Sequence, residues 1–308
     1  MKIISKPTVT VAVSCFNEGE NILPFLESVL KQKETGYVLE KILVYSDGST
    51  DDTVKKAKSL NNSKIKIFAY KKRIGKSSHL NDIYQNLKSD ILVQSDADVI
   101  FSYPYLITDL IKPFKENKSV GMTGGRTLPL PAVTFTEKAV GCSYRVYDQM
   151  RALIGKEHNV YTAIGQILAF KKELVKKINV PSNMTSNDSF TYFSCLTYGY
   201  KYRYVSQALV YFRSPRALRD HIRQGTRIAI TSYRMFEYFK KELVEKEFAL
   251  PRGLLITLMF KEFLRHPVLC SYIFLVNFYC KLKAKSPSQY STAKWAIALT
   301  TKKLDLKI

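Results

Sequence analysis

The chain has 308 residues, 46% of them hydrophobic and 24% charged, a balance typical of a globular protein rather than a disordered one. Its 48 Lys and Arg against 26 Asp and Glu give a net charge of +22, which favours anionic partners such as phosphorylated substrates, acidic lipids or nucleic acid. Five scattered cysteines without Cys-x-x-Cys spacing favour a reduced, cytosolic setting over a disulfide framework or a zinc site.

Strands and helices alternate through the first half of the chain. Strands separated by single helices require crossover connections, so we expect an α/β fold with a doubly wound, mostly parallel sheet flanked by helices. Ligands bind such sheets at the carboxyl ends of the strands, where Asp47, Asp96 and Asp98 are found. The strands are expected at 8–13, 42–45, 65–69 and 91–93, and the helices at 22–30, 51–59 and 77–87.

The second half of the chain is less regular. The simplest partition is a catalytic domain over 1–249, with a nucleotide-binding half over about 7–127 and an acceptor half over about 128–249. A basic, apolar helical region over 250–308 follows. Within 121–249 the pattern predicts strands at 121–127, 202–205 and 209–212, a strand or buried segment at 164–170, a helix ending near 153, and a short helix at 173–178.

Two aspartates one residue apart, Asp96 and Asp98, close the strand at 91–93. Hard cations such as Mg²⁺ or Mn²⁺ prefer carboxylate and water ligands and can bridge the phosphate oxygens of a nucleotide diphosphate. Asp98 is the candidate metal ligand, and Asp96 reaches the metal through water or binds the ribose. The alternative is an ordinary turn or helix start, where Asp is also common.

A second polar group surrounds Asp47, which follows the strand at 42–45 and can accept a hydrogen bond from a nucleobase. Arg73 and Lys76 are candidates for phosphate contacts, with Asn81 in the same group. Gly75 allows close approach of the backbone. The alternative is a solvated, lysine-rich loop.

Asp188 is the candidate catalytic base, because an attacking sugar hydroxyl must lose a proton to a nearby carboxylate. The alternative is an N-cap for the helix expected at 190–198. Further on, Gln224 and Arg227 are three residues apart and would share one helix face in an arginine-rich stretch suited to phosphate.

Taken in order, these segments resemble the family 2 glycosyltransferases with the GT-A fold, over roughly 7–228. The segment 11–18 is similar to the family's opening strand and Tyr-Asn-Glu turn, with Phe16 in place of Tyr. This match implies that Asn17 and Glu18 belong to the donor site. The remaining matches are Asp-Gly-Ser-Thr-Asp at 47–51, Arg-Ile-Gly-Lys at 73–76 and Asp-Ala-Asp at 96–98.

The resemblance implies a role for each matched residue. Asp47 would contact the nucleobase and Asp98 would bind Mn²⁺ or Mg²⁺. The other donor contacts would come from Arg73, Lys76, Asn81 and Asp96, and Asp188 would be the base of an inverting transfer without a covalent intermediate.

The segment 224–228 resembles the Gln-x-x-Arg-Trp element of processive polysaccharide synthases. Ile228 replaces the tryptophan, so single addition of a hexosyl or N-acetylhexosaminyl group is expected instead of polymerisation.

The C-terminal region suggests where the acceptor is found. No run reaches the 18 to 20 apolar residues needed to span a bilayer, but apolar side chains recur at helical spacing over 254–263 and form a dense run over 273–279. Lys281, Lys283 and Lys285 follow, as expected beside anionic headgroups. We expect peripheral attachment to the cytoplasmic membrane face and a glycan or lipid-linked acceptor. A packed helix or a dimer interface is the alternative, and the oligomeric state is left open.

Two other functions compete with sugar transfer. A sugar nucleotidyltransferase would typically begin with a Gly-rich phosphate loop, and none occurs over 9–18. A non-enzymatic basic protein would bind membrane or nucleic acid, with the aspartates serving only as turns and caps. We expect a nucleotide-diphosphate sugar, and no nucleic acid, as the partner.

Overall fold

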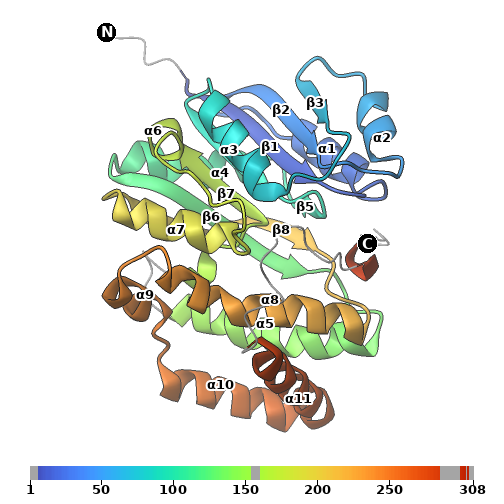
Figure 1. Ribbon diagram of the computed structural model, residues 1–308, viewed down its shortest axis with the longest axis vertical. Coiled ribbons are helices and arrows are strands. Elements are labelled where there is room, and N and C mark those ends of the chain that lie inside the picture. Colours follow the sequence, from blue (N-terminus) through green and yellow to red (C-terminus); the bar gives the residue numbers. More distant parts are fainter. Residues whose placement is uncertain (1–5, 154–159, 285–298, 303, 305–308) are drawn as a thin grey trace.

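A computed structural model describes residues 6–153, 160–284, 299–302 and 304. It contains one eight-stranded sheet in the order β3-β2-β1-β4-β7-β6-β8-β5 (Figure 1). The strands are β1 (Thr8–Cys15), β2 (Val38–Ser46), β3 (Ile65–Ala69), β4 (Ile91–Ser95), β5 (Val99–Phe101), β6 (Val120–Pro129), β7 (Ile167–Lys171) and β8 (Lys201–Phe212).

The predicted parallel unit is confirmed, because β3, β2, β1 and β4 pair in parallel. The rest of the sheet is mixed: β7 runs antiparallel to both β4 and β6, and β5 runs antiparallel to β8. The prediction of two short strands at 202–205 and 209–212 was wrong. They form one strand, β8, whose pairing with β6 shifts register so that Val205 and Leu209 oppose the consecutive residues Gly125 and Arg126. The apparent break in the sequence is therefore a bulge within the strand.

Helices cover both faces of the sheet, as expected for a doubly wound fold. Side chains alternate along each strand: Val11 and Val13 pack with α1, α2 and α4 on one face, and Ala12 packs with α3, α6 and α7 on the other. The helices are α1 (Ile22–Leu30), α2 (Thr53–Ser59), α3 (Lys76–Asn86), α4 (Leu106–Glu116), α5 (Phe135–Leu153), α6 (Lys172–Val175), α7 (Asn187–Thr197), α8 (Leu218–Phe236), α9 (Lys241–Phe248), α10 (Arg252–Arg265) and α11 (Pro267–Ala284).

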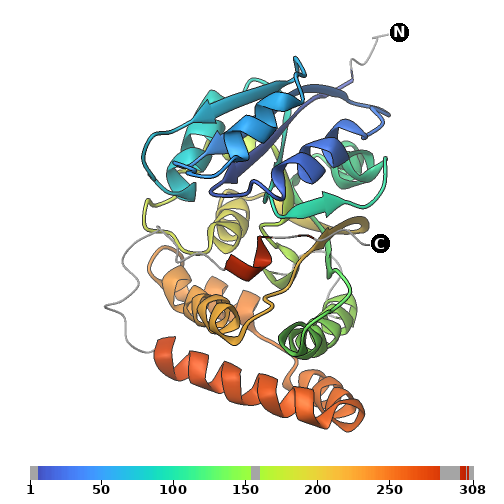
Figure 2. The same ribbon diagram turned by 90° about the vertical axis from the view of Figure 1, so that its right-hand side faces the viewer.

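Helices α10 and α11 form the layer farthest from the sheet (Figure 1). Leu258 of α10 packs against Val146 and Met150 of α5 in a small apolar cluster. Within the described residues, no helix is both long enough and apolar enough to span a bilayer. A short 3₁₀ helix near the C-terminus, η3 (Leu299–Thr301), lies between the sheet and the helices below it (Figure 2).

Candidate active site

The carboxyl ends of three parallel strands meet at one edge of the sheet. Cys15 at the end of β1 pairs with Ser46 at the end of β2, and the backbone N–H of Asp47 continues this ladder to the Cys15 carbonyl at 2.8 Å. Ser95, the last residue of β4, pairs with Val13 of β1. The segments that follow these strands are therefore neighbours, as their positions in the sequence predict.

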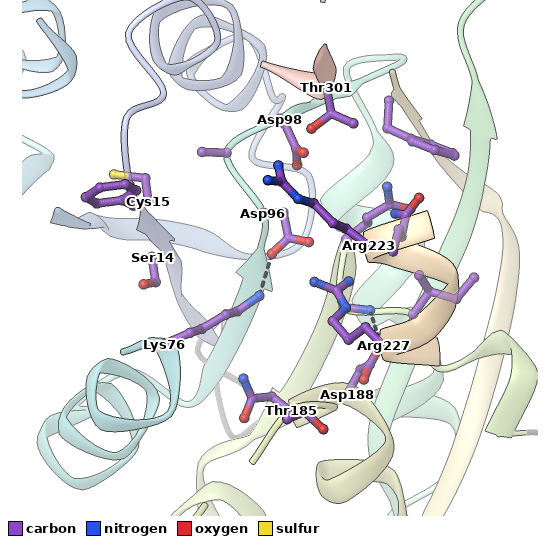
Figure 3. A pocket seen from close by; sticks show the side chains of 18 of the residues that line it. Ser14, Cys15, Lys76, Asp96, Asp98, Thr185, Asp188, Arg223, Arg227 and Thr301 are labelled. Carbon is purple, nitrogen blue, oxygen red and sulfur yellow. Dashed lines mark hydrogen bonds and ion pairs between the residues drawn. The ribbon is translucent and has the colours of Figure 1, made fainter. Parts of the chain in front are cut away.

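A cleft of about 710 Å³ opens at this edge, a volume within the range of ligand pockets. Residues from both halves of the chain line it, including side chains from β-strand ends, α7, α8 and the C-terminal segment (Figure 3). Among the predicted site residues it contains Glu18, Asp47, Arg73, Lys76, Asp96, Asp98, Asp188, Gln224 and Arg227.

Asp47 is almost fully buried and is held by several donors. Its Oδ1 accepts bonds from the backbone N–H of Ile74 at 2.7 Å and from Nε2 of the buried His79 at 2.9 Å. Burial opposes its charge, but the bonds from His79, Ile74 and Gly75 hold the pKa of Asp47 below its ordinary value. Asp47 thus fastens the loop over 73–75 to the end of β2.

Gly48 allows this loop to come close. Its φ is +73°, and a Cβ at this position would lie 3.0 Å from the backbone N of Arg73. The Arg73 guanidinium lies 4.2 Å from the centroid of the Phe16 ring, a cation–π arrangement at the wall of the cleft. Phe16, which stands where the family has tyrosine, therefore packs against Arg73 and helps to hold its side chain in place.

Lys76 lies in the first turn of α3 and forms an ion pair with Asp96 across the cleft (Figure 3). Asp98, two residues further along, has its pKa raised first by burial and then by the charge of Asp96, while Lys302 opposes the shift. Burial and the nearby Asp98 raise the pKa of Glu18 to about 7. The carboxylates of Glu18, Asp96 and Asp98 therefore interact with one another, and a cation beside them favours their charged forms.

Asp188 belongs to the first turn of α7, where Ser186 is the N-cap residue. The predicted helix, 190–198, therefore begins three residues too late, and Asp188 lies inside the helix instead of before it. Its Oδ2 accepts the backbone N–H of Gly165 at 3.2 Å and its Oδ1 accepts that of Ser189 at 2.8 Å. Both oxygens are thus held in a fixed orientation. The buried Asn187 accepts a bond from the Ser77 hydroxyl at 3.0 Å, which ties α7 to α3.

Two predicted donor-site residues lie outside the cleft. The Asn81 side chain is bonded to the backbone of Val180, accepting at 2.7 Å and donating at 2.8 Å, so it joins α3 to the loop before α7. Asn17 has a φ of +51° and accepts the backbone N–H of Thr50 at 2.8 Å, so it braces the neighbouring turn. Both residues shape the walls of the site from outside.

The cleft also contains residues that the sequence did not single out. Arg223 lies one residue before Gln224 and points from α8 toward Asp96 and Asp98 in Figure 3. Its position in the arginine-rich stretch of the sequence was the signal that could have identified it as a site residue. Lys302, by contrast, is 284 residues from Glu18 in the sequence, and no motif marks it.

This sheet, with a cleft at its carboxyl edge, is the GT-A architecture found in nucleotide-sugar transferases. Among solved structures, the chain is similar to the mannosyltransferase PcManGT from Pyrobaculum calidifontis in complex with GDP-Man and Mn²⁺, with a TM-score of 0.62 and 18% identity over 99% of this chain and 89% of that one. Glucosyl-3-phosphoglycerate synthase from Mycobacterium tuberculosis, in complex with Mn²⁺ and UDP-Glc, gives a TM-score of 0.54 at 16% identity, covering 76% and 81% of the two chains. At these identities the likeness shows the fold.

The chain belongs to glycosyl transferase family 2, whose sequence profile matches residues 10–179. A second profile, glycosyl transferase family group 2, matches residues 105–301. Poly-beta-1,6-N-acetyl-D-glucosamine synthase of Staphylococcus aureus (strain COL) is 26% identical over 233 residues, which cover 72% of this chain and 53% of the relative. The chain thus spans about half the length of the curated relatives it matches.

Proposed function

We propose that this chain transfers a sugar from a nucleotide-diphosphate sugar to an acceptor hydroxyl, by a single inverting displacement that depends on a divalent metal. One observation carries the proposal: Asp47, the Asp96–Asp98 pair and Asp188 line one cleft. These are the residues for which the sequence motifs predict nucleobase, diphosphate and acceptor contacts. Membership of the family supports this assignment of roles.

The carboxylates of the cleft fit Mg²⁺ or Mn²⁺ if the substrate supplies the remaining ligands of the metal. The described residues contain no group of three or more His, Cys, Asp or Glu that could bind a metal by themselves. Such cations commonly bind through one or two carboxylates together with substrate phosphates and water. Asp98 would hold the metal directly, with Asp96 acting through water. When bound, the cation would neutralise charge on the leaving nucleotide diphosphate.

Asp188 would accept the proton of the attacking hydroxyl. The backbone N–H groups of Gly165 and Ser189 fix its two oxygens, so little reorganisation is needed as the proton is transferred. Because the hydroxyl would attack the anomeric carbon directly, no covalent enzyme intermediate is required. The bond to the nucleotide diphosphate would break as the new glycosidic bond forms, and the configuration at that carbon would invert.

Arg73, Lys76 and Arg227 would bind the diphosphate, and Gln224 lies on the same face of α8 as Arg227. The named relatives and neighbours include transferases or synthases with GDP-Man, UDP-Glc or N-acetylglucosamine in their names or titles. They support a hexosyl or N-acetylhexosaminyl donor. Ile228, in place of the tryptophan of processive enzymes, supports single addition.

A membrane-proximal or lipid-linked acceptor is supported by the outermost helices. Large apolar side chains on α10 and α11 are exposed, and Lys281 and Lys283 lie in the last turn of α11. Such a surface suits peripheral attachment to the anionic, cytoplasmic face of a bilayer. The exposed apolar residues are Ile256, Met259, Phe260, Phe263, Leu264, Val268, Phe274, Leu275, Phe278, Tyr279 and Leu282.

A panel of UDP-Glc, UDP-GlcNAc and GDP-Man, each with Mn²⁺ and then with EDTA, tests the proposal. We expect metal-dependent release of nucleotide diphosphate from one of them, and none from the Asp98→Asn variant. Absence of release and of nucleotide-diphosphate binding across the panel, together with metal-independent, salt-sensitive RNA binding, would instead support the non-enzymatic alternative.

A further inference from the structure

The last described residues of the chain return to the cleft and are anchored at both ends. Thr300 donates its backbone N–H and its hydroxyl to the buried carboxylate of Asp220 at 2.9 and 2.8 Å. The Leu304 backbone N–H donates to Asn21 Oδ1 at 3.1 Å, and the Leu304 carbonyl accepts a bond from Arg213 at 2.7 Å. The segment therefore bridges the N-terminal half and the α8 side of the molecule, as its position in Figure 2 also shows.

Lys302 lies between these anchors, and its side chain enters the cleft. Its Nζ donates to the Phe16 carbonyl at 3.1 Å and forms an ion pair with Glu18. An ammonium group has three N–H donors, and these two interactions account for two of them, so the third makes no hydrogen bond to the described residues. The side chain is 22% exposed, so the group remains within reach of a ligand in the cleft.

The charges around Lys302 indicate what that ligand would be. The same cleft contains the carboxylates of Asp96 and Asp98, and Lys76 is already paired with Asp96. A nucleotide diphosphate would add several negative charges at this place. Its binding therefore needs cations that are held in position before the ligand arrives. A purely structural alternative is that Lys302 only neutralises the buried Glu18 and so keeps the C-terminal segment attached.

We propose that Lys302 is a donor-binding residue, presented by the C-terminal segment, whose ammonium group binds the diphosphate of the nucleotide donor. This inference rests on the proposed function, because it takes the cleft to be the donor site. Glu18 and the Phe16 carbonyl orient the ammonium group, and Thr300 and Leu304 fix the backbone on either side. The C-terminal segment thereby completes a site whose other donor residues come from the first 230 residues.

Isothermal titration of the 308-residue chain with UDP, GDP and the corresponding monophosphates, in the presence of Mn²⁺, tests the inference. Lys302→Met should weaken binding of the diphosphate that the wild type prefers by about tenfold or more, the value of one charge-assisted hydrogen bond. Binding of the monophosphate should change much less. Lys302→Arg should restore most of the affinity, and Lys246→Met, at an exposed position of α9, should match the wild type. Thermal unfolding checks that each variant is folded.

Each of the other outcomes refutes either the proposed function or the donor-binding role of Lys302. A wild-type chain that binds neither diphosphate refutes the proposed function itself. If the wild type binds and Lys302→Met binds equally well, or loses monophosphate and diphosphate affinity to the same extent, Lys302 has only the structural role. Tighter diphosphate binding by Lys302→Met would also refute the inference, since the C-terminal segment would then compete with the donor.

Discussion

The ammonium group of Lys76, in the first turn of α3, is paired with the carboxylate of Asp96 at the end of β4. The pair joins two motifs that are 20 residues apart in the sequence. It also places a positive charge beside the two aspartates proposed to serve the metal. In the proposed site, Lys76 would therefore interact both with the donor phosphates and with a carboxylate that serves the metal. Binding of the phosphates and binding of the metal would respond to its charge in opposite directions.

Replacing Lys76 by Met should strengthen Mn²⁺ binding in the absence of nucleotide and weaken nucleotide-diphosphate binding, the latter by about tenfold. Removal of the positive charge frees the Asp96 carboxylate and lowers the repulsion of the cation, while the phosphate loses a charged donor. Electron paramagnetic resonance of free Mn²⁺ and calorimetric titration with UDP and GDP measure the two effects. The exposed Lys72→Met is the control. Parallel changes in both affinities would argue against this role.

Asp188→Asn should retain donor binding and lose transfer by about 10² to 10⁴-fold, the usual contribution of a general base. The amide keeps the size of the side chain, and its oxygen can still accept a bond from Gly165 or Ser189, but it cannot take up a proton. Donor titration and turnover with the best nucleotide sugar separate the two effects. Turnover close to that of the wild type would remove Asp188 as the base.

The bonds to Asp47 predict a pH-dependent contribution to stability. Its pKa is lowered in the folded chain, so the contribution is present above the ordinary value of 3.8 and is lost as pH falls below it. Asp47→Asn should lower the free energy of unfolding at pH 7 by about 1 to 3 kcal/mol, because the buried N–H donors lose a charged acceptor.

Urea unfolding between pH 7 and pH 3 measures this effect. The difference from the wild type should shrink toward the acid end of the range. Asp52→Asn, which removes a half-exposed carboxylate paired with Lys56, should change the free energy of unfolding by less than about 0.5 kcal/mol at any pH. A deficit for Asp47→Asn that stays constant down to pH 3 would contradict the assigned pKa.

The convergence of Asp47 with the Asp96–Asp98 pair was predictable from the sequence. Each follows an apolar strand, and parallel strands place their carboxyl ends at one edge. The antiparallel direction of β7 was not predictable, because side-chain periodicity does not report the direction in which a strand runs. The position of Asn81 was also hidden, since its bond to Val180 depends on a contact 99 residues away in the chain. Lys302 was missed for the same reason: its role depends on where the last residues fold back.

The exposed apolar face of the outer helices predicts binding to a membrane surface. Phe274 and Phe278, one turn apart on α11, have stacked rings whose centroids are 6.5 Å apart. These residues are 64% and 54% exposed. If this face meets a bilayer, Phe274→Glu combined with Phe278→Glu should weaken binding to vesicles containing anionic lipid by tenfold or more. The substitutions remove two apolar anchors and add charge that anionic headgroups repel.

Co-sedimentation with phosphatidylglycerol-containing vesicles, against phosphatidylcholine alone, measures that binding. High salt should weaken it, because the basic residues of α11 act through screened charge. Tyr105→Glu, at an exposed aromatic position before α4, is the control and should bind as the wild type does. The wild-type chain could instead fail to bind vesicles, sediment as a dimer and become monomeric with the double substitution. This result would assign the face to a second copy of the chain. The apolar surface would then be a subunit interface and would no longer support a lipid-linked acceptor.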